Sequence, residues 1–132
     1  MTERATLGPC SPLFIAANLQ ASLDHYLTHL GFECRFRSTY PKLFAIVGRN
    51  QAQIMLKVIG DQVPPLPNPQ RHDWARWDAF VYSPDPDRLA QEFSGRDVIF
   101  RQPLRDTDDR LRGFEVADPD GYICFFGRPI DG

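Results

Sequence analysis

The stretch Gly60–Asp73 reads GDQVPPLPNPQRHD and divides the sequence into two nearly equal parts. It holds four of the 12 prolines of the chain. Proline lacks the backbone N–H group that helices and central strands need, so we expect this stretch to be an extended connector. If the parts on either side of the connector have the same order of helices and strands, the fold is built from a repeated unit.

The part before the connector has the pattern of a strand, a helix and three further strands. An apolar run at 12–17 precedes Asn18, a good N-cap residue, and apolar residues then recur every three or four positions up to Leu30. Gly31 can end the helix, because glycine adopts the left-handed conformation found there. Strand-like runs follow at 32–39, 43–47 and 51–58, with turns at Tyr40-Pro41 and at 48–50.

The part after the connector repeats this order. A strand-like run at 76–82 precedes Asp85, which can cap a helix, and Pro86, which suits its first turn. The helix should end at Gly95. Strand-like runs follow at 97–102, 111–117 and 122–127.

We therefore predict a single α+β domain over residues 1–132, built from two βαβββ units. The first unit spans 11–59, the Pro-rich connector 60–73 and the second unit 74–129. The composition, with 42% hydrophobic and 24% charged residues, is typical of one globular domain.

Three stretches resemble the vicinal oxygen chelate superfamily, which includes glyoxalases, bleomycin-resistance proteins and dioxygenases. They are the helix segment 17–32, which ends in HLGF, the FEVADPDGY segment at 114–122, and FGRP at 126–129. The resemblance covers residues 11–129. It implies that the units curl into an incomplete mixed-sheet barrel with helices on the outside. It also implies a concave face that holds a ligand or metal, and a homodimer.

The DPDG sequence at 118–121 predicts how the last two strands pair. It favours a type I turn followed by a left-handed glycine, which closes the hairpin on Asp118 and Tyr122. Glu115 then lies opposite Phe125, and the uniformly apolar face packs on the helices. Glu115 therefore points into the concave face. A two-residue loop would shift the pairing by one residue.

Alternation along the strands assigns the other candidate ligand-binding residues. In the strand that opens the second unit, Trp77, Ala79 and Val81 share a face, and the resemblance implies that Trp77 faces the cavity. In the last strand of the first unit, Gln53, Met55 and Lys57 alternate with residues that face the helix. The candidate set is Trp77, Ala79, Glu115, Ile123, Phe125, Gln53 and Met55.

The resemblance implies metal-ligand positions near Ser11, at Trp77, at Phe125, and at Gln53 or Met55. Only Gln53 could ligate convincingly, and a metal needs about three protein ligands. We therefore expect neither a metal nor a cofactor.

The histidines do not change this expectation. His25 and His29 lie four residues apart, but on the face of the predicted helix opposite its leucines, so we expect them to be solvated. The glutamate that follows the first histidine in the zincin motif is absent. His72, in the connector, is expected on the surface.

Three functions are compatible with the sequence. The first is metal-free binding or sequestration of a small aromatic or cationic molecule, in which Trp77 and Phe125 stack on the ligand and Glu115 is a buried anion. The alternative is a glyoxalase- or dioxygenase-type lyase, isomerase or oxygenase with Glu115 as general base. Nothing supplies its acid partner, because Asp106, Asp108 and Asp109 alternate with arginines as in a solvated loop. The third is a structural dimer whose concave face is filled by side chains.

Charge and cysteine content bound the partners and the compartment. Fifteen basic and 17 acidic residues give a net charge of −2, which does not favour nucleic acid. The three cysteines form no CxxC pair, and no apolar leader opens the chain. The apolar stretch at 13–17 is far shorter than the roughly 20 residues that span a bilayer. We expect a cytoplasmic protein without a membrane partner.

Overall fold

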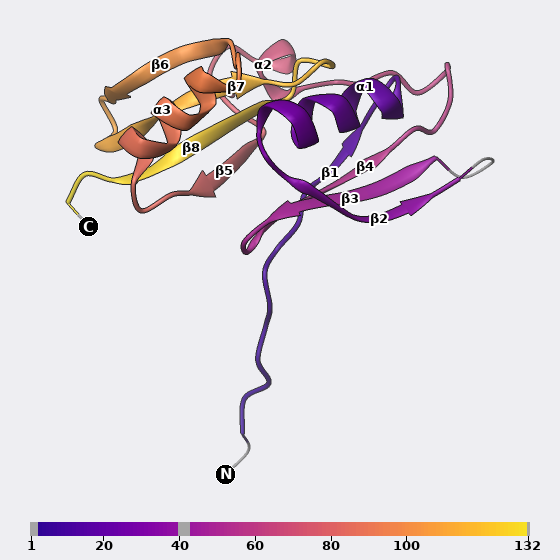
Figure 1. The fold of residues 1–132 in the computed structure, drawn as a ribbon, viewed down its shortest axis with the longest axis horizontal. Coiled ribbons are helices and arrows are strands. Elements are labelled where there is room, and N and C mark those ends of the chain that lie inside the picture. The colour runs from indigo at the N-terminus through magenta and orange to yellow at the C-terminus, as the bar shows by residue number, and fades with distance from the viewer. Residues whose placement is uncertain (1–2, 40–42, 132) are drawn as a thin grey trace.

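The chain folds into two four-stranded mixed sheets, and over the described residues neither sheet closes into a barrel (Figure 1). The structure is a computed structural model and describes residues 3–39 and 43–131. In each sheet the first strand of a unit pairs in parallel with the last, and the other neighbours are antiparallel. The predicted α+β fold of two βαβββ units is confirmed. The sheet orders are β1 (Leu13–Ile15), β4 (Ala52–Lys57), β3 (Phe44–Arg49), β2 (Glu33–Ser38), and β5 (Ala79–Tyr82), β8 (Ile123–Pro129), β7 (Leu111–Ala117), β6 (Phe100–Asp106).

Each unit has one main helix, and its predicted cap is present. Helix α1 (Leu19–Asp24) begins after Asn18, whose side chain accepts the N–H of Ala21 at 3.0 Å, and it continues as a π-helix, η1 (His25–His29). Helix α3 (Pro86–Gly95) begins after Asp85, which caps its first turn in the same way. None of the described helices is long and apolar enough to cross a membrane.

The structure differs from the sequence prediction at several boundaries. The strand expected at 97–102 occupies 100–106 instead, because Asp97 has a positive φ of 63° and the chain turns there. The connector is not wholly extended: it contains a short helix, α2 (Asn68–Arg71), that starts after Pro67. The turn predicted at Tyr40-Pro41 lies outside the described residues.

One hydrophobic core joins the two units. The helix-facing residues of both sheets and the inner faces of α1, η1 and α3 form a single cluster of buried side chains. Figure 1 shows α1 and α3 on the same side of the molecule. The largest fully buried side chains of this cluster are Tyr26, Phe93, Phe114, Phe126, Leu23, Leu30, Ile54 and Leu56.

The DPDG turn of the second unit contacts the helix of the first unit. Asp118 accepts a hydrogen bond from the Tyr26 hydroxyl at 2.9 Å, and Asp120 accepts the N–H of Ala17 at 3.1 Å. The Tyr122 ring stacks on Phe14, with 4.4 Å between ring centroids. The turn that the sequence marks as a hairpin therefore also fastens one unit to the other.

The corresponding turn of the first unit makes the reciprocal contact. Arg49, at the end of β3, forms two hydrogen bonds of 2.7 Å with the Glu92 carboxylate on α3, and Arg96 adds a third at 3.1 Å. These donors hold the pKa of Glu92 below its usual value, the hydrogen bond from Arg49 being the largest cause. Each unit is thus joined to the other by its last hairpin.

Glu92→Gln is expected to lower the free energy of unfolding by about 1 kcal/mol, because a two-pronged ion pair is replaced by a weaker neutral contact. Urea unfolding measures this. Asp131→Asn is the matched control, since it breaks a pair with Arg110 in which both side chains are at least 65% exposed. Its expected change is below about 0.5 kcal/mol. Equal effects of the two variants would contradict a joining role for Glu92.

Candidate ligand-binding site

The faces of the two sheets that point away from the helices carry matching rows of residues. Strand partners lie on the same face of a sheet, so the register defines each row. In the first sheet the row is Leu13, Met55, Ile46 and Phe36. In the second sheet the corresponding row is Phe80, Phe125, Glu115 and Gln102. The first row is wholly apolar, whereas the second combines aromatic and polar groups.

The predicted alternation in β4 and in the last hairpin is confirmed. Ile54 and Leu56 are buried in the core, while Gln53 and Met55 are half-buried on the other face. Glu115 pairs with Phe125, and Ile123 lies on the face of Glu115, two residues from Phe125. The closing pair of the hairpin is Asp118 with Tyr122, as the DPDG rule predicts.

Three aromatic rings form the centre of this face in the second unit. The centroids of Trp77, Phe80 and Phe125 lie 5.5 to 5.9 Å from one another, and we call this group the aromatic platform. Phe125 is fully buried, while Phe80 remains 37% exposed and Trp77 is half-buried. Trp77 and Phe80 therefore present accessible ring surface, and the buried Phe125 packs against both of them.

Two glycines make room for the ring of Phe125. Gly113 and Gly127 pair with each other across β7 and β8, and a Cβ atom on either one would lie 2.7 Å from the ring. Real side chains do not approach so closely. The Phe125 ring consequently packs directly against the backbone of these two glycines, where any larger residue would displace it.

The assignment of Ala79 to the concave face is wrong. Ala79 pairs with Cys124 and packs on the core, and Phe80 occupies the concave position instead. The predicted alternation fails because β5 begins only at Ala79. Before it, the Asp78 carboxylate accepts the N–H groups of Asn68 at 2.6 Å and Ile123 at 2.7 Å, which holds the chain out of the regular pleat. Trp77 reaches the concave face from this irregular segment.

Glu115 is not the unpaired anion that the sequence suggested. Its side chain is only 4% exposed, and one oxygen accepts a hydrogen bond from Arg101 Nη1 at 2.5 Å. The Gln102 amide donates to the other oxygen at 2.9 Å in the orientation that satisfies both neighbours of that amide. A general base or a cation receptor needs a carboxylate that is available, and this one is engaged.

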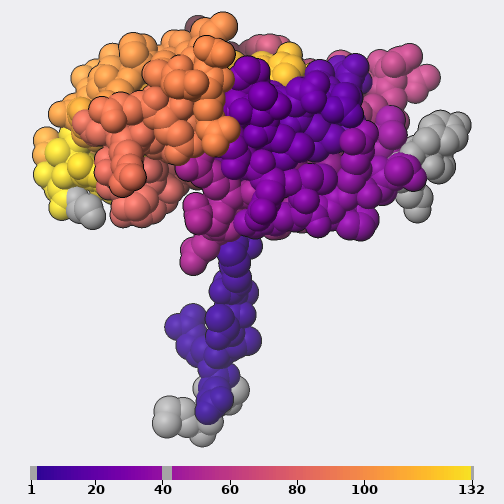
Figure 2. Space-filling view, in the orientation of Figure 1, coloured from indigo at the N-terminus to yellow at the C-terminus, as the bar shows by residue number. Residues whose placement is uncertain are grey.

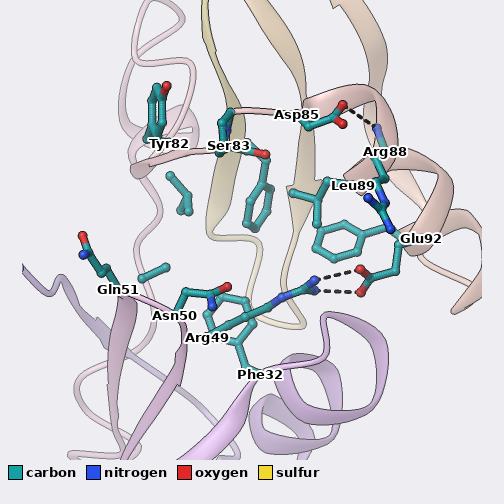
Figure 3. Close-up of a pocket in the computed structure, with 15 residues that line it drawn as sticks. Phe32, Arg49, Asn50, Gln51, Tyr82, Ser83, Asp85, Arg88, Leu89 and Glu92 are labelled. Carbon is teal, nitrogen blue, oxygen red and sulfur yellow. Dashed lines mark hydrogen bonds and ion pairs between the residues drawn. The ribbon is translucent and has the colours of Figure 1, made fainter.

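A cleft of about 650 Å³ lies between the two units on the side of the helices. Figure 3 shows the Arg49–Glu92 ion pair across the cleft, with Tyr82 and Ser83 from the second unit and Asn50 and Gln51 from the first on either side. Sequence reasoning missed this cleft, because it forms only where two units meet. The guanidinium of Arg49 and the carboxylate of Glu92, which lie in this cleft, are paired with each other.

Comparisons with known proteins agree with this architecture. No family model and no curated protein matches the sequence. Among solved structures, TioX from Micromonospora sp. ML1 has a TM-score of 0.68 at 17% identity, over 92% of this chain and 98% of its own. TnmS3, described as an antibiotic binding protein from Streptomyces sp. CB03234, has a TM-score of 0.71 at 15% identity, over 96% and 99%. A glyoxalase, bleomycin resistance protein and dioxygenase superfamily member from Sphaerobacter thermophilus has a TM-score of 0.66 at 22% identity, over 92% and 97%.

The chain has the vicinal oxygen chelate fold. The metal that this fold holds in some of its members would need donor atoms on the concave face. Ser11 and Gln53 do meet there, with the Gln53 amide donating to the Ser11 hydroxyl at 3.0 Å. In the second unit, the positions that the resemblance assigns to metal ligands hold Trp77 and Phe125, and their rings offer no lone pair to a metal. The donor set therefore does not fit a metal centre.

The remaining metal-ligating residue types do not supply one either. Within the described ranges, no group of three or more His, Cys, Asp or Glu side chains is placed to hold a metal ion. His25 is half-buried against Tyr26, contrary to the expectation of a solvated side chain, and His29 Nδ1 lies 2.8 Å from the carbonyl oxygen of Arg96. His72 is exposed, as expected.

Proposed function

We propose that this protein binds a small aromatic molecule without a metal, on the concave face of its second unit. The observation that carries the proposal is the aromatic platform, in which Trp77 and Phe80 present ring surface on the side of the second sheet opposite the hydrophobic core. Aromatic side chains stack favourably on other ring systems, each pair contributing about 1 kcal/mol beyond the area that it buries. A planar ligand is the natural partner of such a surface.

The proposal includes a second copy of the chain that completes the binding crevice. The apolar row of the first sheet ends in Leu13 and Phe36, which are 54% and 52% exposed. Residues 3–8, before Pro9, extend away from the body, as Figures 1 and 2 display, and Leu7 is 92% exposed. Apolar surface of this kind is usually covered in an assembly. Sedimentation equilibrium is expected to give a homodimer.

Two further observations support the proposal. TnmS3, which shares this fold, is described as an antibiotic binding protein, and non-covalent sequestration of an aromatic compound by this chain would be the same kind of activity. The cysteines Cys10, Cys34 and Cys124 are free thiols. Free thiols suit a reducing compartment, so we place this activity in the cytoplasm.

A calorimetric titration tests the proposal. A panel of planar compounds with one to four fused rings is titrated in the presence of EDTA, and at least one compound is expected to bind. Trp77→Ala should weaken its binding about tenfold, as expected for one lost stacking surface in a desolvated site. Arg88→Ala, a change in the lining of the cleft, is the control and should leave the affinity unchanged. Binding that is lost in Arg88→Ala but retained in Trp77→Ala would place the site in the cleft and overturn the proposal.

A further inference from the structure

Three arginines converge beside the aromatic platform. Arg76, Arg101 and Arg105, together with Gln102 and Glu115, line a cavity of about 400 Å³ on the concave side of the second sheet. Arg76 directly precedes Trp77 in the chain, and Glu115 is the strand partner of Phe125. The arginine cavity and the platform are therefore adjoining parts of one surface.

Irregular pairing of β6 brings these arginines together. The register between β6 and β7 shifts on both sides of Gln102. In a regular strand Arg101 would point away from the face that carries Gln102, but here both side chains contact Glu115. Such irregularities re-aim side chains and are common next to binding sites. The cluster is thus a product of strand geometry that alternation cannot predict.

Glu115 acts as the internal anchor of the cluster. One of its oxygens accepts from Arg101, the other accepts from Gln102, and the Gln102 amide oxygen in turn accepts from Arg105. Arg101 also donates to the backbone carbonyl of Arg76 at 3.1 Å. Guanidinium groups held in this way keep their remaining N–H groups directed outward in a fixed geometry.

Positive charge is in excess at this place. The cavity lining contains three arginines and one carboxylate. Asp109 contributes a second carboxylate from outside the lining, but its oxygen lies 3.7 Å from Arg76 Nη1, with both side chains at least 40% exposed. Asp106, the last residue of β6, pairs with Arg112 instead. One positive charge remains unmatched even when both carboxylates are counted.

From this arrangement we infer that the ligand of the concave face is an aromatic molecule that carries a carboxylate. The ring lies on Trp77 and Phe80, and the carboxylate accepts paired hydrogen bonds from the arginines, whose planar fork matches a carboxylate. The inference rests on the proposed function and deepens it. It replaces the expectation of a cationic ligand, because the Glu115 carboxylate is already paired with the Arg101 guanidinium.

Three probes with the same ring system test this inference: 2-naphthoate, 2-naphthamide and 2-naphthylmethylamine. Naphthoate is expected to bind about tenfold more tightly than the amide, since a hydrogen-bonded ion pair adds roughly 1.5 kcal/mol or more. The advantage of the carboxylate should shrink as the salt concentration rises, while the binding of the amide stays constant. The amine should bind most weakly.

Variants locate the effect. Arg105→Gln should remove most of the preference for naphthoate and leave the affinity for naphthamide unchanged. Arg110→Gln, which breaks only an exposed pair with Asp131, is the control and should change nothing.

The outcomes separate this inference from the proposed function. If naphthamide binds through Trp77 but naphthoate has no advantage, the arginine inference fails and the aromatic site stands. If the amine binds best, the inference also fails. If none of the three probes binds and the wider panel binds nothing, both proposals fail together.

Discussion

Gly127→Ala is expected to lower the free energy of unfolding by about 3 kcal/mol and to abolish binding on the concave face. The new Cβ atom would lie 2.7 Å from the Phe125 ring and 2.9 Å from the Gly113 Cα, and closer still to the carbonyl oxygen of Arg112. Overpacking of this kind costs about 1 to 3 kcal/mol in a well-packed core, and backbone atoms of a paired strand cannot move aside as a side chain can. Chemical denaturation monitored by circular dichroism measures the change.

Gly95→Ala is the matched control for this variant. Gly95 is the last residue of α3, and a Cβ atom there would meet nothing within 4 Å. The same chemical change should therefore be neutral or stabilise the protein by up to about 1 kcal/mol, because alanine favours the helix. Similar losses for both variants would contradict the account of the Phe125 ring as packed against the glycine backbone.

Asp118→Asn is expected to change how stability depends on pH. Burial raises the pKa of Asp118 to about 6 from 3.8, even though Tyr26 and two backbone N–H groups donate to its carboxylate. Both folded and unfolded forms are protonated below pH 3.8, so the contribution of this group to stability is full there. It is lost as the pH rises through about 6, and the loss amounts to about 3 kcal/mol.

His25 opposes this trend over nearly the same range. Burial, with a smaller effect of nearby His29, lowers the pKa of His25 from 6.5 to about 4. As the pH falls, His25 therefore becomes protonated near pH 6.5 in the unfolded chain but only near pH 4 in the folded chain. The contribution of His25 is present above pH 6.5 and is lost as the pH falls, by an amount of the same order as that of Asp118.

The two contributions offset each other in the wild type, and single variants should expose them. As the pH rises from 4 to 6, the free energy of unfolding of Asp118→Asn should increase relative to the wild type by about 3 kcal/mol. That of His25→Gln should decrease relative to the wild type by a similar amount over the same range. Urea unfolding at intervals of half a pH unit measures both slopes. His72→Gln changes an exposed histidine and should run parallel to the wild type. Parallel slopes for all three variants would contradict the assigned burial effects.

Local rules predicted the parts of the structure that local interactions determine. The DPDG turn, with Gly121 at a φ of +91°, closes the hairpin on the expected pair, and the caps at Asn18 and Asp85 start both helices. Because the hairpin closes on Asp118 and Tyr122, counting three residues outward along each strand correctly predicted that Glu115 pairs with Phe125. The duplicated order of elements followed from the same kind of reasoning.

The parts that could not be predicted depend on contacts between distant segments. Phe80 takes the place expected for Ala79 because Asp78 binds backbone groups of α2 and β8. The arginine cavity needs the register shifts around Gln102, which sequence alternation cannot reveal. Glu115 appeared as a free anion in the sequence, because its partner Arg101 lies on another strand. The cleft that contains Arg49 is lined by residues of both units, so neither half of the sequence could predict it alone.

The most direct test of the central claim uses the intrinsic fluorescence of Trp77. The chain has two tryptophans, and Trp74 is 87% exposed, so Trp74→Phe leaves Trp77 as the sole reporter. This variant is titrated in EDTA with 2-naphthoate and with the panel of planar compounds, excited where the ligands absorb least. The account predicts a saturable change in the emission of Trp77, with one ligand bound per chain and weakened binding in the additional variant Phe80→Ala. Ligand binding that leaves the emission of Trp77 unchanged, or no binding by any compound, would contradict it.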